Sequence, residues 1–333
     1  MKITKILGTF ALCAMLVPAV SCNKDDDGPD GGGSGSGSGG QYAGNAVVDI
    51  DGEKITEISI YSDEYTIKYD SEGRVSEITS RYGDNFKINY SDNTYTSAYD
   101  DESGTISFNA DGYVSQMTAS WEGSDGDWYE KGQGNATFNY TNGYLTSCSI
   151  TSSGSETDLE DNTTESWDES TKGTLTWTDG KLTFAKFDNL DHESDGDVDQ
   201  WTNQYTYAYS TTPNKYNQFP VYMFNRMDIE SDFADILAGL GLFGKGPSYF
   251  PVSCTETQIE EGSPNWDYTT YFSYDLNSNG SIDVENSGMD NDSYPVVEYT
   301  YGASSKASRA SLQAPAKKHN KIQNIFRAKK HSK

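Results

Sequence analysis

The stretch YTIKYDSEGRVSEIT, residues 65–79, decides the fold of this chain. Apolar side chains alternate along its first half at Tyr65, Ile67 and Tyr69, which places them on one face of a strand. Gly73 follows in a polar segment, where glycine tolerates the positive φ of a tight turn. The residues after the glycine begin a second apolar alternation. The stretch therefore predicts an antiparallel β-hairpin.

The same pattern returns along the chain. Its later copies are residues 104–118, 136–148, 174–185 and 272–282, with turn glycines at Gly112, Gly143, Gly180 and Gly280. The last copy is looser, and we expect Gly73, Gly112, Gly143 and Gly180 to lie in hairpin turns at positive φ. Polar stretches between the copies supply further strands, so the repeat predicts a long antiparallel meander of a dozen or more strands. Because one face is apolar, the sheet is expected to curl into an open or partly closed barrel.

Composition agrees with an all-β fold. Hydrophobic residues make up 34% of the chain, whereas aromatic residues reach 13% and include 24 Tyr. Tyr, Thr and other half-polar residues suit a pleated surface that is partly wet, and disordered chains are poor in aromatics. We therefore expect one curled β domain over residues 41–302.

One convincing helix interrupts the β pattern, at about residues 229–240. Asp228 is a suitable N-cap and Gly241 a plausible stop. Its apolar stripe consists of Ile229, Phe233, Ile236, Leu237 and Leu240. We expect this helix to cover an apolar opening of the curled sheet. A mobile lid over a ligand cavity is the alternative.

The first residues, 1–21, form a secretory signal peptide, with lysines before a short apolar run. Residues 19–22, Ala-Val-Ser-Cys, resemble the bacterial lipoprotein box, in which the cysteine becomes the lipidated first residue. The resemblance implies a lipid anchor at Cys22, since acyl chains tether a protein without spanning the membrane. A plain secreted protein with an incidental Cys22 is the alternative.

Residues 22–40 combine the anchor with an acidic run and a linker. Asn-Lys-Asp-Asp-Asp at 23–27 resembles the export signal of Bacteroidetes lipoproteins, which implies an outer-membrane location facing the cell exterior. A solvated spacer is the simpler explanation. The Gly/Ser segment at 31–40 behaves as a flexible coil with a reach of roughly 15–20 Å.

Charge divides the chain very unevenly. Residues 303–333 hold nine Lys and Arg and no Asp or Glu, while the rest of the chain carries a net charge of −36. Such an acidic body repels nucleic acid and anionic membranes. The basic tail resembles a cationic amphipathic helix that contacts the acidic body or lipopolysaccharide. A disordered extension without function is the alternative.

Two family resemblances follow from these segments. Residues 69–75, YDSEGRV, resemble the YD repeat of Rhs-type shell proteins. Together with TPNKYNQF at 212–219 and GLFGKGP at 241–247, residues 55–301 resemble a Bacteroidetes outer-membrane lipoprotein family of unknown function with a porin-like fold. That resemblance implies a barrel and brings no catalytic residues. The barrel is not expected to be embedded, because Thr66 and Lys68 face away from the apolar side.

Signals for catalysis are nearly absent. His192 is the one histidine of residues 41–302, and no nucleophile, zinc or phosphate-binding motif occurs. Cys148 and Cys254 lie in strand-like apolar contexts, which favours two buried free thiols over a disulfide. We expect no enzyme. A polysaccharide hydrolase with an unrecognised carboxylate pair is the alternative.

Calcium is the one metal that the sequence suggests. Asp275, Asn277, Asn279 and Asp283 place oxygen ligands at alternate positions of a calcium-type loop, but position twelve is Asn286 instead of Glu. The same residues fit the last hairpin without metal. The acids between 188 and 199 form a second cluster, which we expect to be a solvated loop or, alternatively, a calcium site.

Tryptophans in polar segments suggest a ligand. The five candidates are Trp121, Trp128, Trp167, Trp201 and Trp266. Aromatic faces stack on sugar rings, and exposed tryptophan usually marks a contact surface. We therefore expect a surface lipoprotein that acts as a binding or structural module, with glycan as one candidate ligand. The alternatives are rings that cover a sheet edge and an accessory subunit docked to an outer-membrane partner.

Overall fold

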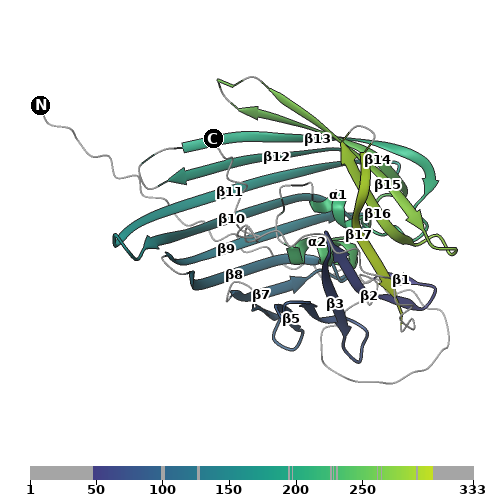
Figure 1. Cartoon of the computed structure of the whole chain (residues 1–333), viewed down its shortest axis with the longest axis horizontal. Helices are drawn as coiled ribbons and strands as arrows, with labels where there is room; N and C mark the ends of the chain where they lie inside the picture. The colour runs from purple at the N-terminus through teal and green to yellow at the C-terminus, as the bar shows by residue number, and fades with distance from the viewer. Residues whose placement is uncertain are drawn as a thin grey trace, which may run out of the picture. The chain divides into compact units, whose positions relative to one another are not determined.

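The structure is a computed structural model that describes residues 48–302, except 99–101, 126–127, 194–195, 197, 226, 228, 230–231, 261, 264 and 290–291 (Figure 1). Its strands and helices are β1 Asp49–Ile50, β2 Glu53–Ile60, β3 Asp63–Tyr69, β4 Val75–Ser80, β5 Asn85–Asn89, β6 Thr94–Ser97, β7 Glu102–Phe108, β8 Val114–Asp125, β9 Trp128–Thr141, β10 Tyr144–Asp158, β11 Thr163–Thr178, β12 Lys181–Glu193, β13 Val198–Pro213, α1 Val221–Asn225, α2 Asp232–Gly239, β14 Tyr249–Glu260, β15 Trp266–Leu276, β16 Ile282–Met289 and β17 Asp292–Tyr301.

The strands form a closed antiparallel barrel of 16 strands, β2 to β17. Each strand pairs with its neighbours in the chain, and the ring closes where β17 pairs with β2, from Val297 opposite Ile60 to Tyr301 opposite Ile55. The short β1 pairs only with β2. The predicted all-β meander is confirmed, and its closure into a barrel is complete.

The repeat glycines lie in turns at one end of this barrel, and the positive φ predicted for Gly73, Gly112, Gly143 and Gly180 is confirmed. Gly73, Gly112, Gly143, Gly180 and Gly280 all have positive φ, between 71° and 90°. In the two shorter turns the preceding residues, Asn142 and Asp179, also have positive φ, at 55° and 51°. Two consecutive positive φ values define the type I′ turn, whose twist matches that of a hairpin.

Five aromatic residues near this end of the barrel bridge neighbouring strands, and three of them, Tyr69, Tyr140 and Trp177, occupy the aromatic position of the repeat. Each donates a hydrogen bond to a backbone carbonyl of the preceding strand, and the pairs are Tyr69 to Ile55 (2.6 Å), Tyr140 to Val114 (2.7 Å), Trp177 to Leu145 (2.7 Å), Tyr209 to Leu182 (2.9 Å) and Tyr301 to Ile282. The two strands of each pair are connected by a loop at the opposite end of the barrel, and no loop connects them at the end that holds the glycine turns. The aromatic donors therefore tie successive hairpins together where the chain does not.

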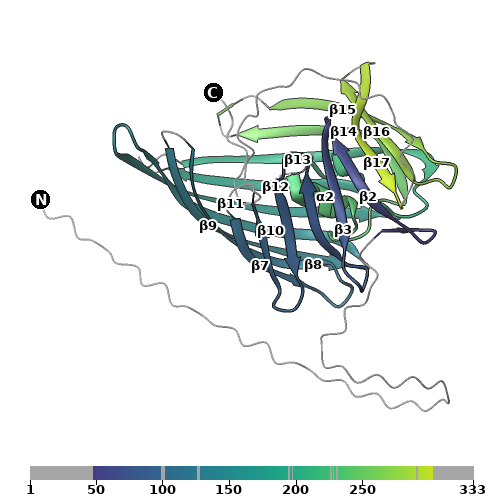
Figure 2. The same ribbon diagram turned by 60° about the horizontal axis from the view of Figure 1, so that its bottom comes forward.

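A segment between β13 and β14, residues 214–248, closes the same end of the barrel. It contains α1 and α2, which the strands enclose (Figures 1 and 2). The predicted helix at 229–240 is present as α2 over 232–239, and α1 was not predicted. Asp228, the expected N-cap, lies outside the described residues. We call residues 214–248 the plug.

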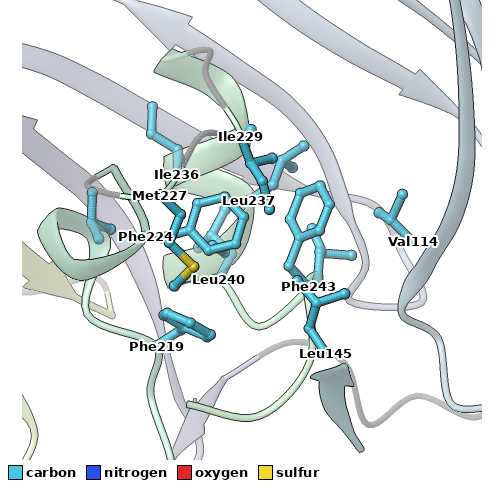
Figure 3. Close-up of a cluster of buried hydrophobic side chains, with 14 of the residues drawn as sticks. Val114, Leu145, Phe219, Phe224, Met227, Ile229, Ile236, Leu237, Leu240 and Phe243 are labelled. Atoms are coloured by element: carbon cyan, nitrogen blue, oxygen red, sulfur yellow. The ribbon is translucent and has the colours of Figure 1, made fainter. Parts of the chain in front are cut away.

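The plug is held by an apolar cluster and by the repeat turns. Its side chains pack against the barrel wall, as Figure 3 shows for Phe219, Phe224, Met227, Ile229, Ile236, Leu237, Leu240 and Phe243 with Val114 and Leu145. Lys245 N donates to Gly143 O and Ser248 N to Gly180 O, both at 2.8 Å. These bonds at one margin, together with fully buried side chains, favour a fixed closure over a mobile lid.

A buried carboxylate of the wall positions α1. Glu285 of β16 accepts hydrogen bonds from Val221 N (2.8 Å), Tyr222 N (3.1 Å) and Tyr299 OH. Burial raises the pKa of Glu285 from 4.5 to about 7, although these three hydrogen bonds act in the opposite direction. The wall thus contacts the start of α1 through a group that titrates near neutral pH.

The outward faces of β9, β10 and β11 are polar. The outward side chains along these strands include Tyr129, Lys131, Gln133, Asn135, Thr137 and Asn139 of β9; Ser147, Ser149, Thr151, Ser153, Ser155 and Thr157 of β10; and Thr164, Ser166, Asp168, Ser170, Lys172, Thr174 and Thr176 of β11. A lipid-facing barrel presents an apolar band instead. These described faces suit water.

No helix of the described residues is both long and apolar enough to span a membrane. Cys22, the signal peptide at 1–21, the linker at 22–40 and the basic tail at 303–333 lie outside the described residues, so they stay predictions.

Candidate functional site

The barrel interior changes character beyond the plug. Strands β8 to β14 reach far past the two helices (Figure 1), and their inward-facing residues form what we call the polar wall. Residues that lie directly opposite one another on adjacent strands point to the same face of the sheet. The inward-facing residues of the wall therefore form rows that run across the strands. Three rows define the candidate site.

The first row combines carboxylates with a serine. Ser152 of β10 lies opposite Glu169 of β11, which lies opposite Asp191 of β12, which lies opposite Asp199 of β13. Ser152, Glu169 and Asp191 are buried. Like charges directly opposite each other destabilise a sheet, and a buried carboxylate is costly unless it is compensated.

The second row is built from tryptophan and glycine. Trp121, Gly132, Gly154 and Trp167 lie opposite one another across β8 to β11. The two indole rings stack over the glycines with centroids 6.0 Å apart and planes at 18°. A Cβ at Gly132 would lie 2.3 Å from the Trp121 ring, and one at Gly154 2.6 Å from the Trp167 ring. Only glycine leaves room for this stack.

The third row is entirely acidic. Glu130, Glu156 and Glu165 lie directly opposite one another on β9, β10 and β11. Glu130 also accepts a hydrogen bond from Trp121 Nε1 at 3.2 Å, which links the second and third rows. These acidic rows were not predicted from the sequence. Strand alternation was a usable signal, but the register also depends on a bulge between Leu145 and Ser147.

The five predicted ligand-binding tryptophans divide into two groups. Trp121, Trp167 and Trp201 are buried, with exposed fractions of 6%, 8% and 7%. Trp128 and Trp266 are exposed, at 41% and 53%. The buried rings line the interior, so the exposed pair is the better candidate for contact with a ligand.

The two exposed tryptophans occupy comparable places. Each is the first residue of its strand at the end of the barrel away from the plug, Trp128 on β9 and Trp266 on β15, and each follows the inward-facing alternation. Trp266 stacks on Tyr268, with centroids 5.5 Å apart and planes at 7°. This pair presents a flat aromatic platform.

A separate groove of about 810 Å³ lies on the outside of β8 to β12. Outward serines and charged residues supply its side chains, and His192 Nδ1 lies 3.4 Å from Asp168 Oδ1 within it. A Ser–His–Asp nucleophile would need a serine hydroxyl bonded to this histidine, and the described residues show no such bond. The groove therefore offers hydroxyl and charged contacts without an assembled nucleophile.

The predicted calcium loop forms the β15–β16 turn. Asn277 N donates to Ser281 O at 2.9 Å, and Asn279 Oδ1 accepts from Ser281 N at 3.1 Å. Lys215 Nζ approaches Asn279 O at 3.3 Å, which places a positive charge beside the loop. Calcium at Asp275, Asn277, Asn279 and Asp283 stays a prediction. Among the described residues no three His, Cys, Asp or Glu are grouped to hold a metal ion.

The second acidic cluster is not a solvated loop where it is described. Asp188 and Asp191 belong to β12 and Asp199 to β13. Asp188 faces outward and pairs with Lys186 at 2.8 Å, whereas Asp191 and Asp199 face inward. Alternation along two paired strands separates these acids onto opposite faces. The loop expectation was wrong for these three residues.

Both predicted thiols are as expected. Cys148 and Cys254 are free and buried.

No protein-family model and no curated protein matches this sequence. Among solved structures, two porin-like proteins are similar to the chain. That from Bacteroides vulgatus has a TM-score of 0.49 and 12% identity, covering 74% of this chain and 97% of its own. That from Bacteroides uniformis has a TM-score of 0.46 and 15% identity, covering 74% and 96%. This similarity is too weak to carry a conclusion about this chain.

Proposed function

We propose that this chain is a lipid-anchored protein of the bacterial outer-membrane surface whose barrel is a binding module held outside the bilayer. The Cys22 motif and the acidic run after it support the location. The Ser- and Thr-rich outward faces support a barrel surrounded by water, because lipid tails offer no hydrogen bonds to hydroxyls and amides. Because the plug fills one end of the barrel, we expect a ligand to bind at the other end.

The exposed aromatic platform at the end away from the plug carries the binding proposal. Trp266 and Tyr268 lie nearly parallel, and Trp128 is exposed on another strand at the same end. Flat aromatic faces beside polar groups suit sugar rings, which present C–H faces and hydroxyl edges. Gln258, opposite Trp266, supplies an amide for such hydroxyls. Glycan is therefore the ligand class that we propose.

A glycan array with the full-length protein tests this function. Trp266→Ala and Trp128→Ala should each weaken binding to any positive glycan by about tenfold or more, as is common for aromatic anchors. Tyr271→Ala is the matched control, because Tyr271 is exposed on the outward face of the same strand, β15. Equal losses in all three variants, or no glycan bound, would contradict the proposal. Cleaved glycan without added enzyme would support the hydrolase instead.

The anchor has its own test. Cys22→Ala should release the protein from the membrane fraction, and labelled palmitate should mark only the wild type. Changing Lys24 and Asp25, Asp26 and Asp27 to Ala should keep the anchor but hide the protein from added protease. Membrane retention of the Cys22 variant would remove the lipoprotein assignment, and continued protease access would remove the export signal.

A further inference from the structure

The polar wall concentrates negative charge inside the barrel. Its inward acids are Glu130, Glu156, Asp158, Glu165, Glu169, Asp191, Asp199, Glu256 and Glu260. Lys131, Lys172 and Lys186 belong to the same strands but face outward by alternation. Within the described part of the chain, no Lys or Arg faces inward from β8 to β14. The inward face of β8 to β14 is therefore acidic.

These acids lie as like-charged neighbours on adjacent strands. Two rows set carboxylates directly opposite one another, Glu130–Glu156–Glu165 and Glu169–Asp191–Asp199. Cross-strand like charges oppose pairing, and their repulsion is stronger inside a protein than in water. A positively charged occupant between the strands would turn this repulsion into attraction.

Ser152 independently points to an occupant at the same level. The relative exposure of Ser152 is 5%, so the residue is about 95% buried. It faces inward and lies directly opposite Glu169. Its Oγ has no hydrogen-bond partner in the described part of the chain. A buried hydroxyl normally finds a partner, since an unmade hydrogen bond is costly. A donor-rich group against this row would supply one.

One segment of the chain has the required chemistry and length. Residues 303–333 carry nine Lys and Arg and no acid. β17 ends at Tyr301 on the plug side, and its 10 residues make a wall about 33 Å tall. An extended chain from Gly302 to Lys317 spans about 50 Å, so the basic residues beyond it can pass over that wall.

We propose that the basic C-terminal segment, residues 303–333, binds inside the barrel against the acidic rows of the polar wall. The segment then acts as a tethered polycation that fills the interior beyond the plug. Its attachment gives it a high effective concentration, so a separate cationic ligand has to displace it. The aromatic platform around Trp266 does not depend on this contact, and the proposal stands whether or not glycan binds there.

The first test uses the unaltered full-length protein. A zero-length carbodiimide crosslinker joins lysines to carboxylates that touch them, and mass spectrometry identifies the pairs. At low salt the lysines of 317–333 should join to inward acids such as Glu130, Glu156 and Glu169. Crosslinks only to outward acids, or no tail crosslinks, would overturn the proposal.

The second test compares adjacent acids on opposite faces of β11. A labelled peptide of residues 303–333 is titrated into full-length protein whose nine tail Lys and Arg are changed to Gln. Glu169→Gln should weaken this binding about tenfold, whereas Asp168→Asn should change it less than about twofold, because Asp168 faces outward. Raising salt towards 1 M, where the Debye length is about 3 Å, should also weaken it.

Three outcomes of the second test would overturn the proposal. They are no peptide binding at low salt, equal weakening by the two variants, and binding by the wild type as tight as by the tail-neutralised protein. The unfolding midpoint of each variant checks its fold, and if Glu169→Gln fails to fold, the crosslink pattern of the wild type decides.

Discussion

The plugged end of the barrel and the polar wall are made from the same strands but follow different rules. At the plugged end, glycine turns, aromatic donors and apolar side chains recur from hairpin to hairpin. Along the polar wall, strand lengths vary, and the inward positions carry Trp, Gly and acids that follow no repeat. The difference suggests that the repeat encodes stability, whereas the non-repeating wall is available for binding. Four experiments can test that division.

The largest effect is expected from the centre of the plug. Phe243 is fully buried and contacts Phe138 and Phe224, with ring centroids 4.9 and 5.3 Å away. Phe243→Ala should lower the free energy of unfolding by about 3–5 kcal/mol, because it leaves a cavity. Trp266→Ala, at an exposed position, should lower it by less than about 1 kcal/mol. Urea unfolding measures both changes. Similar losses of stability in the two variants would contradict the proposed difference between the plugged end and the polar wall.

Glu285 should give the plugged end a pH dependence. Its pKa is raised, so between pH 4.5 and 7 the native state keeps a proton that the unfolded chain has lost. The free energy of unfolding should therefore fall as pH rises through that window, by a few kcal/mol, and level off above it.

Glu285→Gln should remove this part of the slope. Comparison of the two proteins by denaturant unfolding at several pH values cancels the contribution of the other acids. Parallel curves for wild type and variant would show that Glu285 does not titrate in this window.

A repeat glycine should matter more than a wall glycine. Gly112 has φ of 84°, so Gly112→Val should cost about 1–2 kcal/mol of stability through backbone strain. Gly123 in β8 lacks positive φ and has no heavy atom within 4 Å of a built Cβ, so Gly123→Val should cost less. Thermal unfolding of the pair provides the comparison, and a larger loss at Gly123 would contradict it.

The smallest effect concerns a single hydroxyl. Tyr209→Phe removes the hydrogen bond to Leu182 O (2.9 Å) and should cost about 0.5–1.5 kcal/mol. Tyr271 is exposed and faces outward, so Tyr271→Phe should leave stability nearly unchanged. If both changes are neutral in urea unfolding, the aromatic donors do not tie the hairpins energetically.

Much of the plugged end could be predicted from local sequence. Asn142-Gly143 and Asp179-Gly180 specify tight turns because few other residues accept two consecutive positive φ values. The stripe at Ile229, Ile236 and Leu240 specified a buried helix. The calcium loop and the platform tryptophans are still predictions, since their sequence patterns fit a plain hairpin or a buried ring equally well.

The sequence by itself determined the antiparallel hairpins, their turn glycines, the apolar helix and the opposite charges of body and tail, because each depends on neighbours along the chain. Tertiary structure alone decided that β17 meets β2, that Trp121 stacks on Trp167, and that Glu130, Glu156 and Glu165 share a row. Those contacts join distant residues, and their partners follow from strand register. A single bulge shifts that register and turns every later side chain to the other face.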